Sequence, residues 1–204
     1  MAKLGAMDAT DLDPDPLRQL QAWMAAARDA GQPLPEAMCV ATSSPDAEPS
    51  ARMVLLRGVD SGLVFFTDYG SPKAADIEAT GRAAAVLHWM LPVQRQVRVT
   101  GAAARVAAIE SDRYWATRPV GSRRSALASH QSEVVASRAE LQARVDELAR
   151  LPDDDPALAR PDRWGGFRIT PDTVELWEAG AFRLHDRIRF RRAGAGWTAE
   201  RLSP

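Results

Sequence analysis

Short apolar segments rich in β-branched and aromatic residues recur along this chain, and turn-forming residues separate them. Three such segments follow one another closely, at 38–42, 51–57 and 63–67. Turn signals containing Pro45 and Gly62 lie in the two gaps. Strands this close in sequence pair antiparallel, because a parallel pair needs a crossover of a dozen or more residues. The spacing therefore predicts an antiparallel meander and argues against a parallel α/β sheet.

The rest of the chain adds further strands and a few inserted helices. Strands are expected at 84–89, 95–106, 166–170, 173–178, 187–192 and 197–202. Helical periodicity or helix-start signals occur after Asp15-Pro16, at 71–79, at 108–118 and 122–130, and after Ser137. The predicted fold class is mainly β with α additions, an antiparallel β-barrel decorated with helices.

The two ends of the chain differ in character. Residues 1–14 contain several aspartates and no apolar core of the kind that a secretory signal has, so we expect a flexible N-terminal tail there. Residues 15–204 are expected to form a single domain. No segment has the apolar length of a membrane span, and the lone Cys39 excludes an intrachain disulfide. These features favour a cytoplasmic protein that does not bind membranes.

Charge and motif content exclude several classes of function. The formal net charge of -1 argues against a nucleic-acid binder. The three histidines, His88, His130 and His185, have no metal-ligating residues at suitable spacing, so no metal site is expected. The chain lacks a P-loop, a complete dinucleotide fingerprint and a G-x-S-x-G motif. A phosphorylated ligand would therefore have to be held by scattered side chains.

Two basic clusters occur in the first half of the chain. Arg52 and Arg57 lie five residues apart, so on a regular strand they face opposite sides and would serve different ligands. Solvated strand-end charges are the alternative interpretation. Ser71-Pro72-Lys73 resembles a helix start, where free backbone N–H groups attract an anion, although most such sites bind only water.

Two further clusters occur in the second half. Tyr114 and Arg118 lie four residues apart on one predicted helical face, near Ser122 and the pair Gln131-Ser132. Arginine and hydroxyl donors suit a phosphate, while an ordinary polar helix face is the alternative. Trp177 precedes a stretch in which Arg183, His185 and Arg187 alternate. Three cationic groups on one face of an extended segment favour a bound anion over packing, and a solvated surface is the alternative.

These clusters have the order and approximate spacing found in pyridoxamine 5'-phosphate oxidases, and the chain resembles that family from about Asp15 to Pro204. The resemblance is strongest in the segments RMVLLR, FFTDYGSPKA, RQVRVTG, YWATRP, HQS, WGGFRI, ELW, RLHDR and ERLSP. It implies an FMN-binding split β-barrel that forms a homodimer with FMN at the subunit interface. The implied reaction oxidises pyridoxamine 5'-phosphate or pyridoxine 5'-phosphate to pyridoxal 5'-phosphate, and O2 is reduced to H2O2.

The resemblance also implies roles for individual residues. Arg52 and Lys73 would hold the FMN phosphate. The full cofactor-binding set would be Arg52, Met53, Val54, Leu55, Leu56, Arg57, Phe66, Thr67, Lys73, Gln96, Gln131, Ser132, Trp177 and Arg187. The phosphorylated pyridine substrate would be bound by Arg57, Tyr114, Arg118, Ser122, Arg183 and His185. Arg183 and His185 would lie over the pyridine ring as the catalytic pair.

Three departures from the family pattern bear on substrate identity. The family usually has Lys where this chain has Arg57, and commonly has Arg where this chain has Pro72. Residues 123–127 also differ from the family's usual sequence. Two alternative functions remain, which are an FMN oxidase of another aromatic substrate, of the dihydrophenazine type, and a non-catalytic protein that binds flavin or pyridoxal phosphate.

Overall fold

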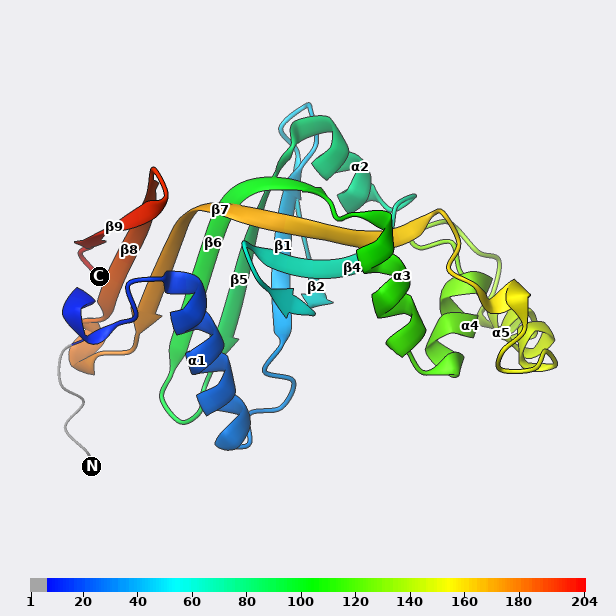
Figure 1. Cartoon of the computed structure of the whole chain (residues 1–204), viewed down its shortest axis with the longest axis horizontal. Helices are drawn as coiled ribbons and strands as arrows, with labels where there is room; N and C mark the ends of the chain where they lie inside the picture. The colour runs from blue at the N-terminus through cyan, green and yellow to red at the C-terminus, as the bar shows by residue number, and fades with distance from the viewer. Residues whose placement is uncertain (1–6) are drawn as a thin grey trace.

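The computed structural model describes residues 7–204, and a curled antiparallel sheet of nine strands forms its framework (Figure 1). The strands are β1 (Ala37–Ser43), β2 (Pro49–Leu55), β3 (Gly58–Val59), β4 (Leu63–Asp68), β5 (Arg82–Trp89), β6 (Arg95–Arg105), β7 (Trp164–Glu178), β8 (Asp186–Ala193) and β9 (Gly196–Arg201). The sheet order is β2-β1-β5-β6-β7-β4-β3, and β8 pairs with both β7 and β9. The expected antiparallel pairing is confirmed, since neighbouring strands pair antiparallel throughout. The expected meander of 38–42, 51–57 and 63–67 is wrong, because β4 pairs with β3 and β7 and not with β2.

Strand β7 connects the two ends of the sheet. Its first part pairs with β4 and its last part pairs with β8, while β6 runs along its other edge. Figure 1 shows β7 crossing the molecule from the side of α3–α5 to the side of β8–β9. The sequence analysis expected two strands here, at 166–170 and 173–178. The structure joins them into one, with a register shift opposite Gly101, where an added Cβ would lie 2.0 Å from the Thr170 carbonyl oxygen.

The core lies between the curled sheet and α1. Inward-facing positions alternate along the strands, and Met38, Val40 and Leu87 are fully buried. Helix α1 (Pro16–Asp29) covers this face with Leu17, Leu20, Trp23 and Ala27. Asp15 accepts a hydrogen bond from the Leu17 N–H at 3.0 Å, which is the expected N-cap.

Four further helices decorate the sheet. They are α2 (Pro72–Thr80), α3 (Ala108–Thr117), α4 (Val120–Ala128) and α5 (Arg138–Ala149), with single 3-10 turns η1 (Ala9–Asp11), η2 (Pro156–Leu158) and η3 (Ala181–Arg183). α2 ends at Gly81, whose left-handed φ of 68° suits glycine. Helices α3, α4 and α5 form a lobe at one end of the molecule (Figure 1). Arg124 joins α4 to α5 through the Leu148 and Leu151 carbonyls.

The N-terminal segment differs from the expected flexible tail. Residues 1–6 lie outside the described part of the chain. Residues 7–14 pack against β8 and β9, because the Met7 N–H donates to Asp186 at 3.0 Å and Arg201 donates to the Met7 carbonyl. Met7 itself is buried. The aspartates in this segment cap the turns of the chain, as Asp8 does for η1.

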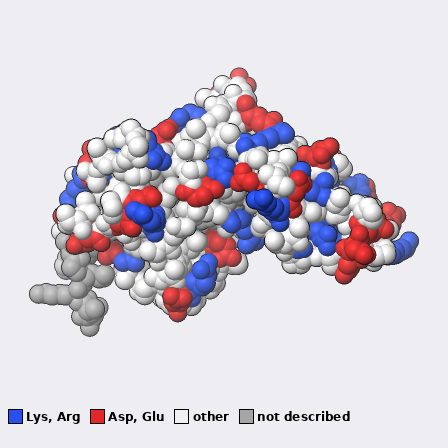
Figure 2. Space-filling view, viewed as in Figure 1, with Lys and Arg blue, Asp and Glu red and all other residues white. Residues whose placement is uncertain are grey.

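Charged side chains of both signs are interspersed on the face shown in Figure 2, which has no extended surface of one sign. Within residues 7–204, none of the helices combines the length with the apolar composition needed to cross a bilayer.

Candidate functional site

A cavity of about 1210 Å³ lies between strands β2 and β4 and helices α3 and α4. Thirteen of the side chains expected at a cofactor or substrate site line it, namely Arg52, Met53, Val54, Leu55, Arg57, Phe66, Thr67, Lys73, Tyr114, Arg118, Ser122, Gln131 and Ser132. Leu56 does not line the cavity, because its side chain is buried in the core. Folding thus joins the first three clusters, which are far apart in the sequence.

Lys73 supplies a buried cation at one end of this cavity. Its ammonium donates to Gln131 Oε1 at 2.7 Å, to Ser71 Oγ at 3.0 Å and to Thr67 Oγ1 at 3.1 Å. Burial lowers the pKa of Lys73 to about 8, the neighbouring charge of Arg52 lowers it as well, and Asp68 opposes both effects. Among the described residues, no carboxylate lies within ion-pair distance of this ammonium. The hydrogen bonds of this ammonium are therefore all to neutral acceptors.

Arg52 adds a second cation beside Lys73. Its guanidinium donates to Thr42 Oγ1 at 2.8 Å and to Ser50 Oγ at 2.7 Å, and both acceptors are neutral. The hydroxyls hold the guanidinium in place without neutralising it. Two adjacent cations with neutral partners favour a bound anion, because charge-assisted bonds to phosphate are among the strongest hydrogen bonds.

A second cationic group lies in the same cavity around Arg118. Burial lowers the pKa of Arg118, Tyr114 opposes this, and the nearby charge of Arg57 lowers it further. The Arg118 guanidinium lies 4.6 Å from the ring centre of Trp164 and donates to the Ser122 carbonyl at 2.8 Å. The ring of Tyr114 stacks on that of Phe66 at 4.0 Å. A guanidinium and several aromatic rings thus lie side by side in this part of the cavity.

The two arginines of the first cluster serve different parts of the cavity. Arg52 lies beside Lys73, whereas the guanidinium of Arg57 lies 5.9 Å from the ring centre of Tyr114. The expected strand to residue 57 is too long, because β2 ends at Leu55. Strand alternation therefore does not decide where Arg57 points, and both arginines line the same cavity.

The fourth cluster, which consists of Trp177, Arg183, His185 and Arg187, does not line the cavity. Gln96, Trp177 and Arg187 are direct cross-strand neighbours on β6, β7 and β8, and the His185 ring lies 4.7 Å from that of Trp177. Trp164 lines the cavity, and Trp177 follows 13 residues later on the same strand. At roughly 3.3 Å per residue this corresponds to up to about 40 Å. Neither Trp177 nor its neighbours Gln96, His185 and Arg187 line the cavity.

The expected alternation of Arg183, His185 and Arg187 is wrong. Arg183 belongs to turn η3 with a φ of 66°, and β8 begins only at Asp186. The expected repulsion is also relieved, because Arg187 donates to Glu175 on β7 at 2.9 Å. Turn η3 carries Arg183 outward next to Phe182, whose side chain is 97% exposed.

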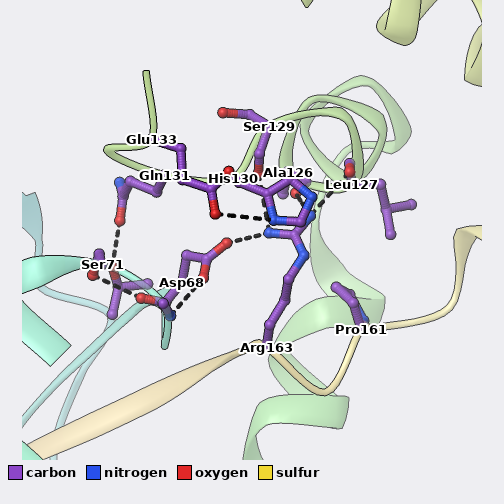
Figure 3. Close-up of polar contacts among 12 residues, drawn as sticks. Asp68, Ser71, Ala126, Leu127, Ser129, His130, Gln131, Glu133, Pro161 and Arg163 are labelled. Atoms are coloured by element: carbon purple, nitrogen blue, oxygen red, sulfur yellow. Dashed lines mark hydrogen bonds and ion pairs between the residues drawn. The ribbon is translucent and has the colours of Figure 1, made fainter. Parts of the chain in front are cut away.

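Sequence reasoning missed three residues near the cavity. Trp164 and Asp68 line it, and Arg163 pairs with Asp68 (Figure 3). The ring of Trp164 stacks on that of Phe66, with 5.5 Å between the ring centres. Trp164 begins the segment WGGFRI, and this position was the signal that could have identified it. The partners of Arg163 lie 34 or more residues away, and no local pattern indicated them. Across residues 7–204, no group of three or more His, Cys, Asp or Glu side chains is arranged to hold a metal ion.

Two family models match this chain. The model described as "Pyridoxamine 5'-phosphate oxidase" covers residues 24–151, and the model described as "Pyridoxine 5'-phosphate oxidase C-terminal dimerisation region" covers residues 164–204. A pyridoxine/pyridoxamine 5'-phosphate oxidase of Rubrobacter xylanophilus is 48% identical, over 94% of this chain and 88% of the relative. That of Burkholderia multivorans is 47% identical, over 98% of this chain and 94% of the relative.

Solved structures confirm the expected fold, an FMN-binding split barrel. PhzG of Burkholderia lata, solved with tetrahydrophenazine-1-carboxylic acid, has a TM-score of 0.87 and 31% identity to this chain. The match covers 98% of this chain and 100% of PhzG. An FMN-binding protein of Nostoc punctiforme related to pyridoxamine 5'-phosphate oxidase has a TM-score of 0.73 and 17% identity. That match covers 93% of this chain and 98% of the Nostoc protein.

Proposed function

The chain belongs to the pyridoxamine 5'-phosphate oxidase family, and we propose that it is itself an FMN-dependent oxidase of pyridoxamine 5'-phosphate or pyridoxine 5'-phosphate. The product would be pyridoxal 5'-phosphate, and O2 would be reduced to H2O2. The observation that carries this proposal is the presence of two cationic groups in one cavity, Arg52 with Lys73 and Arg57 with Arg118. A flavin phosphate and a substrate phosphate would account for both.

FMN fits the residues at the first group. The buried ammonium of Lys73 has only neutral acceptors, and a phosphate dianion would supply the missing negative charge. Arg52 would bind a second phosphate oxygen, while Thr67 and Gln131 would hydrogen-bond the polar chain or ring edge. When bound, the flavin supplies the two-electron redox chemistry, for which no protein nucleophile is needed.

The second group would hold the substrate by its phosphate. Arg118 and Arg57 would donate charge-assisted hydrogen bonds, and the hydroxyls of Tyr114 and Ser122 would complete the grip. Each such bond contributes roughly 1.5–3 kcal/mol net. The aromatic stack of Phe66, Tyr114 and Trp164 supports this wall of the cavity. A single anchored end would orient the ring and place its oxidisable carbon reproducibly.

We further propose that the site becomes complete only in a homodimer. One chain separates the cavity from the group around Trp177 by up to about 40 Å along β7. A two-fold dimer presents the same surfaces on both subunits, so it can bring the cavity of one copy against the Trp177 group of the other. Arg183 and His185 of the second copy would then cover the pyridine ring. The match to a dimerisation region over residues 164–204 supports this arrangement.

An anaerobic flavin-bleaching assay tests the proposed function. The purified protein should take up FMN and show the yellow flavin absorption bands. Addition of pyridoxamine 5'-phosphate without air should bleach those bands, and air should restore them with release of H2O2. A protein that takes up no FMN, or a flavin that pyridoxamine and pyridoxine phosphates leave coloured, would contradict the proposal.

The same assay separates the alternatives. The identity of 31% to PhzG makes a dihydrophenazine-type substrate the second candidate, against 48% and 47% to the pyridoxine/pyridoxamine 5'-phosphate oxidases of Rubrobacter xylanophilus and Burkholderia multivorans. Bleaching by a dihydrophenazine carboxylate but not by pyridoxamine 5'-phosphate would favour that candidate. Uptake of flavin without bleaching by either would favour a non-catalytic binding protein.

A further inference from the structure

We propose that Arg163 is a positioning residue that sets the flavin-phosphate end of the cavity without touching a ligand. This inference rests on the proposed function, since it concerns how the cavity binds FMN. Arg163 does not line the cavity. It lies immediately before β7, and Asp68, at the end of β4, pairs in register with Trp164.

The Arg163 guanidinium joins three parts of the fold (Figure 3). Nη1 donates to Asp68 Oδ2 and to the Ser129 carbonyl, the latter at 3.0 Å. Nη2 donates to the Ala126 and Leu127 carbonyls, each at 2.9 Å. These carbonyls lie at the C-terminal end of α4, where helix groups lack partners and a cation is favourable. One side chain therefore links the ends of β4 and α4 to the start of β7.

This link fixes the segment that carries Gln131. Helix α4 ends at Ala128, and three residues later Gln131 Oε1 accepts hydrogen bonds from Thr67 and Lys73, both at 2.7 Å. In residues 7–204, Arg163 is the one side chain that donates to backbone carbonyls of residues 126–132. Without it, the backbone of this segment would lose its link to the start of β7.

Arg163 also controls the charge of the cavity wall. The Asp68 side chain is only 7% exposed, and Asp68 lines the cavity near Lys73. Its Oδ1 accepts from the Gly70 N–H at 2.8 Å, while Oδ2 depends on Arg163 for its ion pair. A buried carboxylate that loses its partner is strongly unfavourable. Near a bound phosphate, such a carboxylate would also repel the ligand.

A set of four variants tests this inference. Arg163→Met removes both the hydrogen bonds to the carbonyls of residues 126–129 and the charge that pairs with Asp68. Arg163→Lys keeps a charge for Asp68 but cannot reach all four acceptors. The double variant Asp68→Asn with Arg163→Met removes the carboxylate charge that Arg163→Met leaves unpaired. Arg168→Met is the matched control. Arg168 lies on β7, five residues after Arg163, and its side chain is 21% exposed against 24% for Arg163. It pairs with carboxylates away from the cavity.

Two measurements are made on each full-length variant. The first is the FMN dissociation constant from flavin fluorescence titration. The second is hydrogen exchange of the backbone amides in residues 129–132 of the flavin-free protein. Each variant is measured at the same number of degrees below its own melting temperature. Exchange reports local opening of this segment and does not depend on flavin.

Arg163→Met should weaken FMN binding about tenfold, equivalent to about 1.4 kcal/mol, and should accelerate exchange at 129–132 by a similar factor. Arg163→Lys should fall between this variant and the wild type. The double variant should recover part of the FMN affinity but not the slow exchange. Arg168→Met should leave both measurements within about twofold of the wild type.

Equal effects of Arg163→Met and Arg168→Met would overturn the inference, since they would indicate a general loss of stability. Unchanged exchange at 129–132 in Arg163→Met would also overturn it. If the wild-type protein binds no FMN, the proposed function fails, but the exchange measurement still decides whether Arg163 fixes this segment.

Discussion

The pH dependence of FMN binding follows from the state of Lys73. Burial and the charge of Arg52 lower its pKa to about 8 in the flavin-free chain, so the ammonium loses its proton within an accessible pH range. A bound phosphate dianion would stabilise the charged form and return the pKa toward the ordinary value of 10.5. FMN binding would therefore take up a proton above pH 8, and affinity must fall as pH rises.

The lowered pKa of Lys73 determines how much the FMN affinity changes with pH. With a pKa of about 8, the protonated fraction of Lys73 falls from about nine tenths at pH 7 to about one tenth at pH 9. If FMN binds the protonated form, its dissociation constant rises roughly tenfold over this interval. A phosphate monoester with a second pKa near 6 remains a dianion throughout, so its own ionisation adds little.

The assay is a fluorescence titration of FMN at several pH values between 7 and 9. Lys73→Met should bind FMN more weakly at pH 7 and should show no slope with pH. Arg52→Met is the contrast, because arginine does not titrate in this range. This variant should bind FMN more weakly but keep a slope with pH, displaced to higher pH, because loss of the Arg52 charge raises the pKa of Lys73. A flat wild-type profile, or a slope that persists in Lys73→Met, would refute the reasoning.

Further outcomes concern stability, substrate binding, turnover and assembly. Flavin-free Lys73→Met should be more stable than wild type below pH 8, by at most about 3 kcal/mol, and chemical denaturation should show the difference closing toward pH 10.5. Arg118→Ala should raise the substrate KM about 10- to 100-fold in steady-state assays, with unchanged FMN titration. Arg183→Ala with His185→Ala should keep flavin but lower turnover roughly 100-fold. Phe182→Asp should shift the protein to monomers by sedimentation and release FMN, whereas a flavin-loaded monomer would contradict the composite site.

The fold was largely predictable because its signals are local. Pro16 and Gly81 mark a helix start and a helix end, and Ser137 accepts from the Glu140 N–H at 3.1 Å as the capping pattern predicts. Alternation identified each half of β7, but joining the halves depends on a register shift against β6 that involves residues far apart in sequence. Likewise, the order of residues 7–14 depends on Asp186 and Arg201, which no local pattern connects to the N-terminus.

The site was predictable only as far as residue type and motif order allow. Cationic clusters indicated anion binding, and folding places Arg52 and Lys73 together in the cavity. The sequence did not indicate that Glu175 would neutralise Arg187, or that Arg163 would pair with Asp68, because these are contacts between separate elements. It also did not reveal that the Trp177 group lies outside the cavity, since the two strands expected at 166–170 and 173–178 form the single long strand β7.

Complementation between two inactive chains tests the composite dimer site most directly. One chain would carry Arg118→Ala, and the other would carry Arg183→Ala with His185→Ala. Differently tagged and co-expressed, they can be purified as a heterodimer. If each site takes the Arg118 part from one copy and the Arg183 part from the other, one of the two sites is intact and the heterodimer should show about half of wild-type turnover. Turnover no greater than the mean of the two variant homodimers would contradict the account.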